Sequence, residues 1–270
     1  MKHKKLIVLL SGGLLFSVFA GLILTRHIAG SSQNLELQIR SARTSYKQGE
    51  VVNLAFALVN NGGKELIIND CFGTRSGVLG VWVAKNGEPF LKYRHPGWGT
   101  SDSDCRSVLK SGAKLETMTR LFWNWKPNLE GLNKDVAKAA AEDRILTDYV
   151  FPEPGVYQLK AVNYVLVGDQ TTPTRIESEP VQITVEEPLG EDAEVWKKIR
   201  DRGDIGYFIQ EGEFKTVKPE EREKLRQELA EISSRYANST LAKQIARSLQ
   251  WFGAKDAKRK SIQQKMKQPE

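Results

Sequence analysis

The segment Val52-Asn53-Leu54-Ala55-Phe56-Ala57-Leu58 decides the fold, because large apolar side chains alternate in it with small or polar ones. Successive side chains of a β-strand point to opposite faces, so the four large apolar residues fall on one face. The turn residues Asn60-Asn61-Gly62-Gly63 then end the run. The segment therefore predicts a half-buried strand whose apolar face packs against a second layer.

Further strand-like runs lie on both sides of this segment. They are Leu35–Arg40, Leu66–Ile68, Val78–Ala84, Pro89–Tyr93, Leu115–Trp125, Gly155–Val167 and Glu179–Val185. The Asn86-Gly87 pair between two of these runs is a strong signal for a two-residue hairpin turn. Because no helical pattern alternates with the strands, we expect a mainly β fold, an antiparallel β-sandwich.

The segment Pro154-Gly155-Val156-Tyr157-Gln158-Leu159 resembles the tyrosine corner of immunoglobulin-like domains. With Tyr46–Val52 and Asn60-Asn61-Gly62, it makes residues 34–187 similar to bacterial immunoglobulin-like domains of surface and periplasmic proteins. The resemblance implies that Tyr157 bonds back to upstream backbone, and it implies no functional residues. Leu159 stands where antibody domains have a cysteine, so any disulfide here differs from theirs.

The pattern becomes helical after residue 190, and we expect a helical region over 190–253. An apolar stripe of Leu225, Leu229, Ile232 and Tyr236 recurs at helical spacing. The run Tyr236–Ala242 followed by Ala246 resembles the hairpin turn of tetratricopeptide-like repeats, although one hairpin cannot form a solenoid. An Ala-rich stretch, Asp135–Ile145, predicts one more short helix. Residues 254–270 are rich in Lys, Arg and Gln and predict a basic flexible tail.

Residues 1–30 predict a signal peptide or a membrane anchor. Leu6–Leu24 carries no charge, and as a helix of about 1.5 Å rise per residue it could cross a bilayer. Lys2, Lys4 and Lys5 would stay in the cytoplasm, which places the rest of the chain outside the cytoplasmic membrane, periplasmic or extracellular. The long apolar run favours an uncleaved anchor, while Ala29-Gly30-Ser31-Ser32 leaves a cleaved signal open.

The charge distribution argues against nucleic acid as a partner. The 270-residue chain has a formal net charge of +7, but the first 30 and the last 17 residues together carry +8. The body between them is therefore close to neutral. A nucleic-acid groove needs clustered Lys and Arg on a folded face.

Cys71 and Cys105 are the two cysteines of the chain. In an oxidising compartment the simplest expectation is one disulfide between them. The alternative is a reactive thiol at Cys105, whose neighbour Arg106 would favour the thiolate.

Candidate site residues are sparse, and we expect no catalytic, cofactor or metal site. The chain has only three histidines, so few residues are available for a His-based triad or a zinc site, and it has no Gly-rich phosphate loop. The best candidate is a ligand-binding loop carrying His95, Trp98, Asp102 and Asp104. Its acids lack the further spaced oxygen ligands that a calcium loop requires.

These patterns predict a non-catalytic exported or membrane-anchored binding protein, an adaptor that docks an envelope protein through its sandwich loops and helical tail. One alternative is a carbohydrate-binding module that uses the aromatic ring of Trp98. Another is a protease-inhibitor-like domain that presents the loop over residues 93–112.

Overall fold

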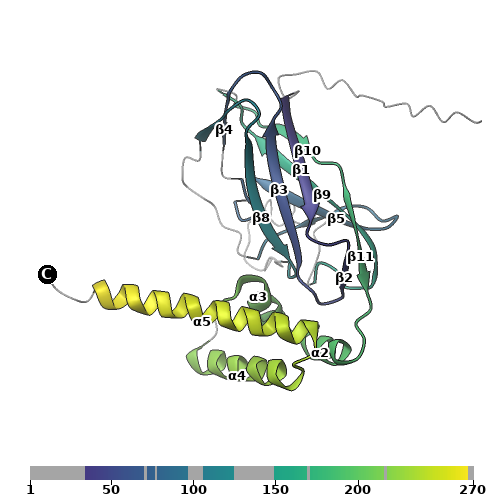
Figure 1. Cartoon of the computed structure of the whole chain (residues 1–270), viewed down its shortest axis with the longest axis vertical. Coiled ribbons are helices and arrows are strands. Elements are labelled where there is room, and N and C mark those ends of the chain that lie inside the picture. Colours follow the sequence, from purple (N-terminus) through teal and green to yellow (C-terminus); the bar gives the residue numbers. More distant parts are fainter. Residues whose placement is uncertain are drawn as a thin grey trace, which may run out of the picture.

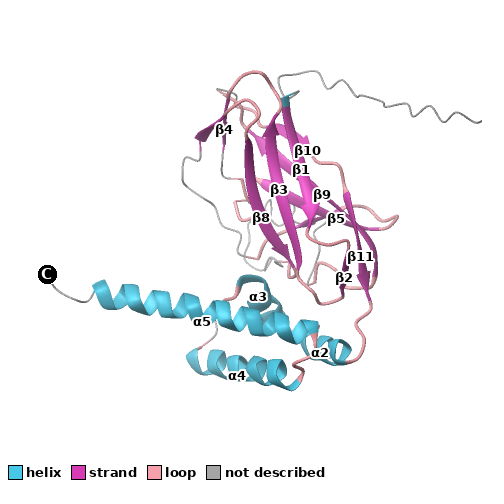
Figure 2. Cartoon of the chain, viewed as in Figure 1, coloured by secondary structure: helices cyan, strands magenta, loops and turns pink. Residues whose placement is uncertain are grey.

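The structure, a computed structural model, describes residues 34–69, 72–76, 78–96, 106–124, 149–168, 171–215 and 218–266. In this part of the chain eleven strands precede four helices (Figures 1 and 2). The strands are β1 (Leu35–Ser41), β2 (Ser45–Lys47), β3 (Val52–Asn60), β4 (Leu66–Asn69), β5 (Leu79–Lys85), β6 (Leu91–Tyr93), β7 (Arg106–Leu109), β8 (Lys114–Leu121), β9 (Gly155–Val165), β10 (Thr174–Glu177) and β11 (Val181–Glu186). The helices are α2 (Glu191–Ile199), α3 (Gly203–Glu211), α4 (Pro219–Arg235) and α5 (Thr240–Met266).

The secondary structure is mixed and sheet-rich. In the described part of the chain about 36% of the residues are in strands and 31% in helices, so the prediction of a mainly β chain understates the helical share. The order of the two parts, strands first and helices after residue 190, is as the sequence predicts. The helices take up so large a share because α5 alone runs for 27 residues.

Two larger sheets face each other. The smaller has the order β1-β3-β8, and its central strand β3 contains the alternating segment from Val52 to Leu58. The larger has the order β2-β11-β9-β5-β6, with β10 also paired to β9. All pairs in both are antiparallel except β2 with β11, which is parallel and departs from the predicted all-antiparallel arrangement. The parallel pair arises because the chain crosses from one sheet to the other between β1 and β2.

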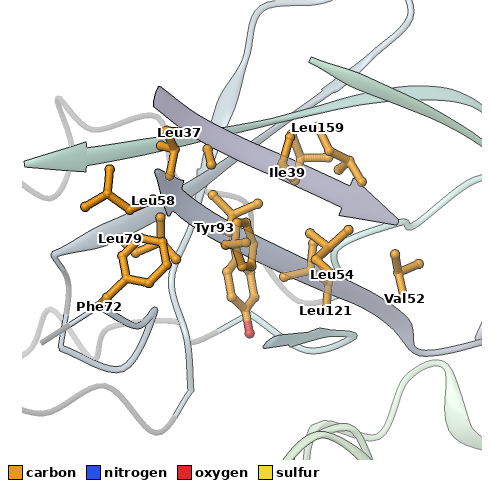
Figure 3. Close-up of a cluster of buried hydrophobic side chains, with 14 of the residues drawn as sticks. Leu37, Ile39, Val52, Leu54, Leu58, Phe72, Leu79, Tyr93, Leu121 and Leu159 are labelled. Carbon is orange, nitrogen blue, oxygen red and sulfur yellow. The ribbon is translucent and has the colours of Figure 1, made fainter. Parts of the chain in front are cut away.

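A hydrophobic core fills the space between the two sheets (Figure 3). The alternate residues of β3 that the sequence assigns to one face all point into it and are almost fully buried. Leu37 and Ile39 from the adjacent strand β1 and Leu159 from β9 in the facing sheet lie in the same core. The period-two pattern therefore identifies the core face of this strand correctly.

Tyr157 lies at the start of β9 and is buried. Its hydroxyl donates a hydrogen bond to the backbone carbonyl of Glu153 at 2.7 Å. Burial of a phenol requires such a partner, and a carbonyl four residues upstream supplies it. This is the type of bond that a tyrosine corner makes.

The helices form a second cluster that shares residues with the sheets. Val51, Phe122 and Tyr149 pack among apolar side chains of α2, α3, α4 and α5. The chain over Asp192–Ile209 forms two helices, α2 and α3, because it turns between Ile199 and Gly203. The sheets and helices are therefore joined by a common apolar core.

α4 and α5 form a hairpin whose ends follow local rules. Pro219 occupies the first turn of α4, where its missing amide hydrogen costs nothing. The Ser239 hydroxyl accepts a hydrogen bond from the Ala242 amide at 3.1 Å and so caps the start of α5. α5 continues to Met266, so residues 254–266 are helical, although their composition predicts a flexible tail. Propensity explains the difference, because Ala, Lys, Arg and Gln are good helix formers.

Several predictions fall outside the described residues. These concern the membrane segment Leu6–Leu24, the helix over Asp135–Ile145, both cysteines, and the loop residues Trp98, Asp102 and Asp104. None of the helices in the described ranges is both long enough and apolar enough to span a membrane.

The β4–β7 ladder makes the predicted disulfide testable. Its last pair is Asn69–Arg106. Cys71 follows Asn69 by two residues, and Cys105 precedes Arg106 by one residue. Paired positions of antiparallel strands have Cα atoms about 4.5–5.5 Å apart, so the ladder brings the segment that leads to Cys71 beside the segment that follows Cys105. We expect peptide mapping without reductant to recover Cys71 linked to Cys105, and reduction to lower the free energy of unfolding by roughly 2–4 kcal/mol. A double variant, Cys71→Ser with Cys105→Ser, should be insensitive to reductant, whereas two free thiols in the untreated chain would contradict the prediction.

Candidate functional site

The seam between the sheets and the helices is held by buried polar contacts. The side-chain amide of Gln244 on α5 donates to the Gly49 carbonyl at 3.0 Å and accepts from the Val51 amide at 2.7 Å. The Tyr149 hydroxyl donates to the Ile199 carbonyl at 2.5 Å. Since a buried polar group without a partner is costly, these bonds fix one relative position of the two parts.

A second contact fixes the start of α2. Asp192 is buried, and its carboxylate accepts from the Ser239 hydroxyl at 2.6 Å and from the Leu241 amide at 3.1 Å. The Lys47 ammonium lies 2.5 Å from the same carboxylate. Burial is the largest single influence on the pKa of Asp192 and raises it. The three contacts together outweigh burial, so the pKa of Asp192 is lowered. The carboxylate thus joins β2, α2 and the start of α5.

A pocket of about 510 Å³ opens along this seam, between the end of the smaller sheet and α5. It is lined by Arg43, Glu50, Val51, Asn53, Arg120, Thr240, Gln244, Arg247, Ser248 and Trp251. The sheet side contributes the turns around β2 and the end of β8, and α5 contributes residues spaced three or four apart. That spacing places them on one face of the helix.

Positive charge dominates the pocket. Three guanidinium groups line it, with one carboxylate, that of Glu50. Glu50 is already paired with Arg43 at 3.1 Å and accepts from the Lys47 amide at 2.7 Å. Within the described ranges neither Arg120 nor Arg247 forms an ion pair. Two guanidinium charges therefore face the pocket without a carboxylate partner among the described residues.

Arg120 is held rigidly at the base of the pocket. Its Nη1 donates to the Gln210 carbonyl at 3.3 Å, and its guanidinium carbon lies 5.4 Å from the centroid of the Trp251 ring. Burial lowers the pKa of Arg120, and the positive charge of Arg247 acts in the same direction, whereas Glu211 opposes it. Both guanidinium groups carry a charge that would attract an anion in the pocket.

Trp251 forms the outer wall of the pocket and remains 37% exposed. Its indole packs on the backbone of Gly212, which caps α3 in the left-handed conformation with φ of +64°. The Lys255 ammonium lies 3.8 Å from the ring centroid, a cation–π contact. The indole is thus fixed from the α3 side while its edge stays accessible.

A buried charged cluster lies beside the pocket, at the end of α3. The Glu211 carboxylate is almost fully buried and contacts Arg75 and, at 3.3 Å, Nε2 of His95. Burial raises the pKa of Glu211. Burial also lowers the pKa of His95 to about 4, and the charge of Arg75 adds to this effect. His95 is therefore neutral near pH 7.

The sequence candidates and the pocket do not coincide. His95 is 6% exposed and belongs to the cluster around Glu211, not to an exposed loop surface. Its loop partners Trp98, Asp102 and Asp104 lie outside the described residues. In the part of the chain that the structure describes, no group of three or more His, Cys, Asp or Glu side chains could hold a metal ion.

Sequence reasoning missed the arginines of the pocket. Arg43 and Arg120 come from turns and strand ends far apart in the sequence, and no motif links them to α5. The one local signal was Arg247, Trp251 and Lys255 at intervals of four residues. That spacing marks a basic, aromatic face on a helix.

Comparisons with known proteins offer no closer guide. No family model and no curated protein matches the sequence. The putative ApaA protein of Bordetella pertussis gives a TM-score of 0.28 at 10% identity, over 56% of this chain and 91% of that one. The alkylpurine DNA glycosylase AlkC of Pseudomonas fluorescens gives 0.28 at 9% identity, over 57% and 30%. A β-glucosidase of Listeria innocua gives 0.24 at 10% identity, over 56% and 16%. Similarities this weak carry no argument about this chain.

Gly212→Ala should disrupt the outer wall of the pocket. A Cβ there would lie 2.2 Å from the Trp251 ring, and an alanine in the left-handed conformation is itself strained. We expect the free energy of unfolding to fall by about 2 kcal/mol, measured by urea denaturation, with a shift in tryptophan emission. Gly253→Ala is the matched control, because nothing lies within 4 Å of its Cβ position. That control should stabilise the helix slightly, and equal destabilisation by both would contradict the proposed packing.

The neutral state of buried His95 predicts acid sensitivity. Its pKa of about 4 lies below the value of about 6.5 for an unfolded histidine, so the unfolded chain binds more protons between these values. Stability from this residue is therefore lost as the pH falls from about 6.5 towards 4. Glu211, whose pKa is raised, acts in the opposite direction, so the difference between wild type and His95→Gln is the quantity to measure.

Between pH 7 and pH 4.5, we expect the wild type to lose about 2 kcal/mol more stability than His95→Gln. Chemical denaturation at each pH gives both curves. The variant must first match the wild-type circular dichroism at pH 7. Parallel curves for the two proteins would show that His95 is not buried in its neutral form.

Proposed function

We propose that this chain is a non-catalytic binding module that recognises a carboxylate-bearing ligand in the arginine-lined pocket of the seam. One observation carries the proposal: Arg120 and Arg247 face a pocket of about 510 Å³ whose single carboxylate is already paired with Arg43. Arginine offers donors in a planar fork that matches the two oxygens of a carboxylate. An acidic group placed between the two guanidinium groups would relieve their repulsion.

The open rim of the pocket favours a group on a partner protein over an enclosed small molecule. Arg43 has a side chain 54% exposed, and Trp251 is 37% exposed. Small-molecule sites usually bury 70–90% or more of their ligand. A pocket with walls this accessible suits an acidic side chain that enters from a larger surface.

The donors in the pocket suit binding better than proton transfer. Glu50 already accepts two hydrogen bonds, from Arg43 and from the Lys47 amide. Gln244 is committed to the backbone at the seam. The remaining polar groups are hydroxyl, amide and guanidinium groups, which position a ligand without activating it.

The wider setting that we propose is an exported envelope protein with an immunoglobulin-like sandwich. Two facing sheets and the hydrogen bond from Tyr157 to Glu153 support the sandwich. The uncharged run Leu6–Leu24 behind a lysine cluster supports export or anchoring. The oxidation state of Cys71 and Cys105 in chain isolated from cells tests this setting, because stable disulfides are rare in the cytosol.

Arg247→Gln tests the binding site directly. Arg247 is exposed, so its loss should leave the fold intact while removing one of the two unpaired guanidinium groups. Using an N-acetylated glutamate dipeptide as probe, we expect isothermal calorimetry to show affinity reduced about tenfold, corresponding to roughly 1.4 kcal/mol.

The matched control is Arg222→Gln on α4, which removes the same charge from an exposed position outside this pocket. Its affinity for the dipeptide should equal that of the wild type. Absence of binding by the wild type, or equal losses in the two variants, would overturn the proposal. Binding of inorganic phosphate in preference to the dipeptide would count against a carboxylate ligand.

A further inference from the structure

The face of α5 that lines the pocket continues along the helix beyond the pocket. Positions 244, 247, 248 and 251 line the pocket, and the helical repeat places Lys255, Lys258 and Ile262 on the continuation of that face. The C-terminal part of α5 extends past the N-terminal end of α4 and away from the sheets (Figure 1). The continuation therefore forms a ledge leading out of the pocket, which we call the α5 ledge (Lys255, Lys258, Arg259 and Ile262).

Positive charge continues along the α5 ledge. Lys258 is exposed, while Lys255 and Arg259 share the single carboxylate of Glu213, at 3.1 Å and 3.0 Å. The one acidic residue of this stretch of α5, Asp256, pairs with Lys260 at 2.8 Å on the opposite face. The pocket and the ledge thus form one basic strip. Ile262, 47% exposed, adds an apolar position at its outer end.

The length of the basic strip indicates how long a ligand must be to contact all of it. From Trp251 to Ile262 the helix rises about 16 Å at 1.5 Å per residue. An extended peptide covers that distance in about five residues at 3.3 Å each. A single carboxylate would occupy the pocket alone, whereas an extended acidic segment would satisfy both the pocket and the ledge.

We propose that the partner presents an extended acidic peptide segment, with one acidic side chain between Arg120 and Arg247 and the following residues along the α5 ledge. This rests on the function proposed above and names the class of its ligand. Charge complementarity carries the inference, because the strip is basic along its whole length while residues 31–253 taken together are close to neutral.

The test compares acetylated and amidated glutamate peptides of two, four and six residues by calorimetry on the full chain. We expect affinity to rise with length up to about five residues, the span of the ledge, and then to level off. Lys258→Gln should leave the dipeptide affinity unchanged and weaken the hexapeptide about three- to fivefold, the range for one exposed ion pair. Lys260→Gln is the matched control, because it removes the same charge from the opposite face of the same helix and should weaken neither peptide.

The outcomes separate the two proposals. If the dipeptide binds and Arg247→Gln weakens it, but affinity does not rise with length, the pocket is a carboxylate site and the extended ligand is wrong. Equal losses in Lys258→Gln and Lys260→Gln would also overturn it, since they would indicate general attraction to a basic helix. Tighter binding of a sulfated oligosaccharide than of the hexapeptide at equal charge would replace the acidic peptide with an anionic glycan. If the dipeptide does not bind, the proposed function itself fails.

Discussion

The bidentate contact of Gln244 with the turn before β3 is the interaction on which the rest of the structure depends. One amide side chain on α5 satisfies both a carbonyl and an amide hydrogen of a turn that also carries Glu50. If α5 shifted by one turn, both backbone groups would be left buried without partners, at a cost of a few kcal/mol. The same contact sets the width of the pocket, since Gln244 and Val51 both line it.

Tryptophan rings resting on glycines close the seam around that contact. Trp196 packs on Gly49, Trp123 on Gly203 and Gly206, and Trp251 on Gly212. At Gly49 and Gly212 the backbone has positive φ, so glycine is needed both for conformation and for space. These rings add to the common apolar core and let the helices approach the strands closely where glycines leave room for them.

Much of the sheet region follows from the sequence, and the site does not. Alternation predicts β1, β3, β5 and β11 because each has one buried face over several residues. β2 and β7, of three and four residues, are too short for such a pattern to be visible. Glycine has a low helix propensity, yet Gly203 and Gly206 both lie in α3, where the Trp123 ring occupies the space that a Cβ would need.

The pocket escapes prediction for a different reason. Its charged residues come from turns and strand ends of the sheet region and from a late helix, and their meeting depends on how the two parts pack. His95 illustrates the same limit. Its loop sequence, with Pro96 and Gly97 after it, predicts exposure, but the end of α3 covers it. Local pattern describes elements, whereas contacts between distant elements decide which polar groups become a site.

The position of β1 gives the molecule a polarity. The chain enters the sheets at Leu35, at the end of the molecule opposite the helices (Figure 1). β3 alone, nine residues long, separates the two ends by about 30 Å at 3.4 Å per residue. A separation of about three nanometres is several Debye lengths at physiological salt, so charges at the end where the chain enters the sheets are screened from the basic strip. The electrostatic potential of the strip is therefore set by its own residues and by the salt concentration, and not by what lies at the far end of the sheets.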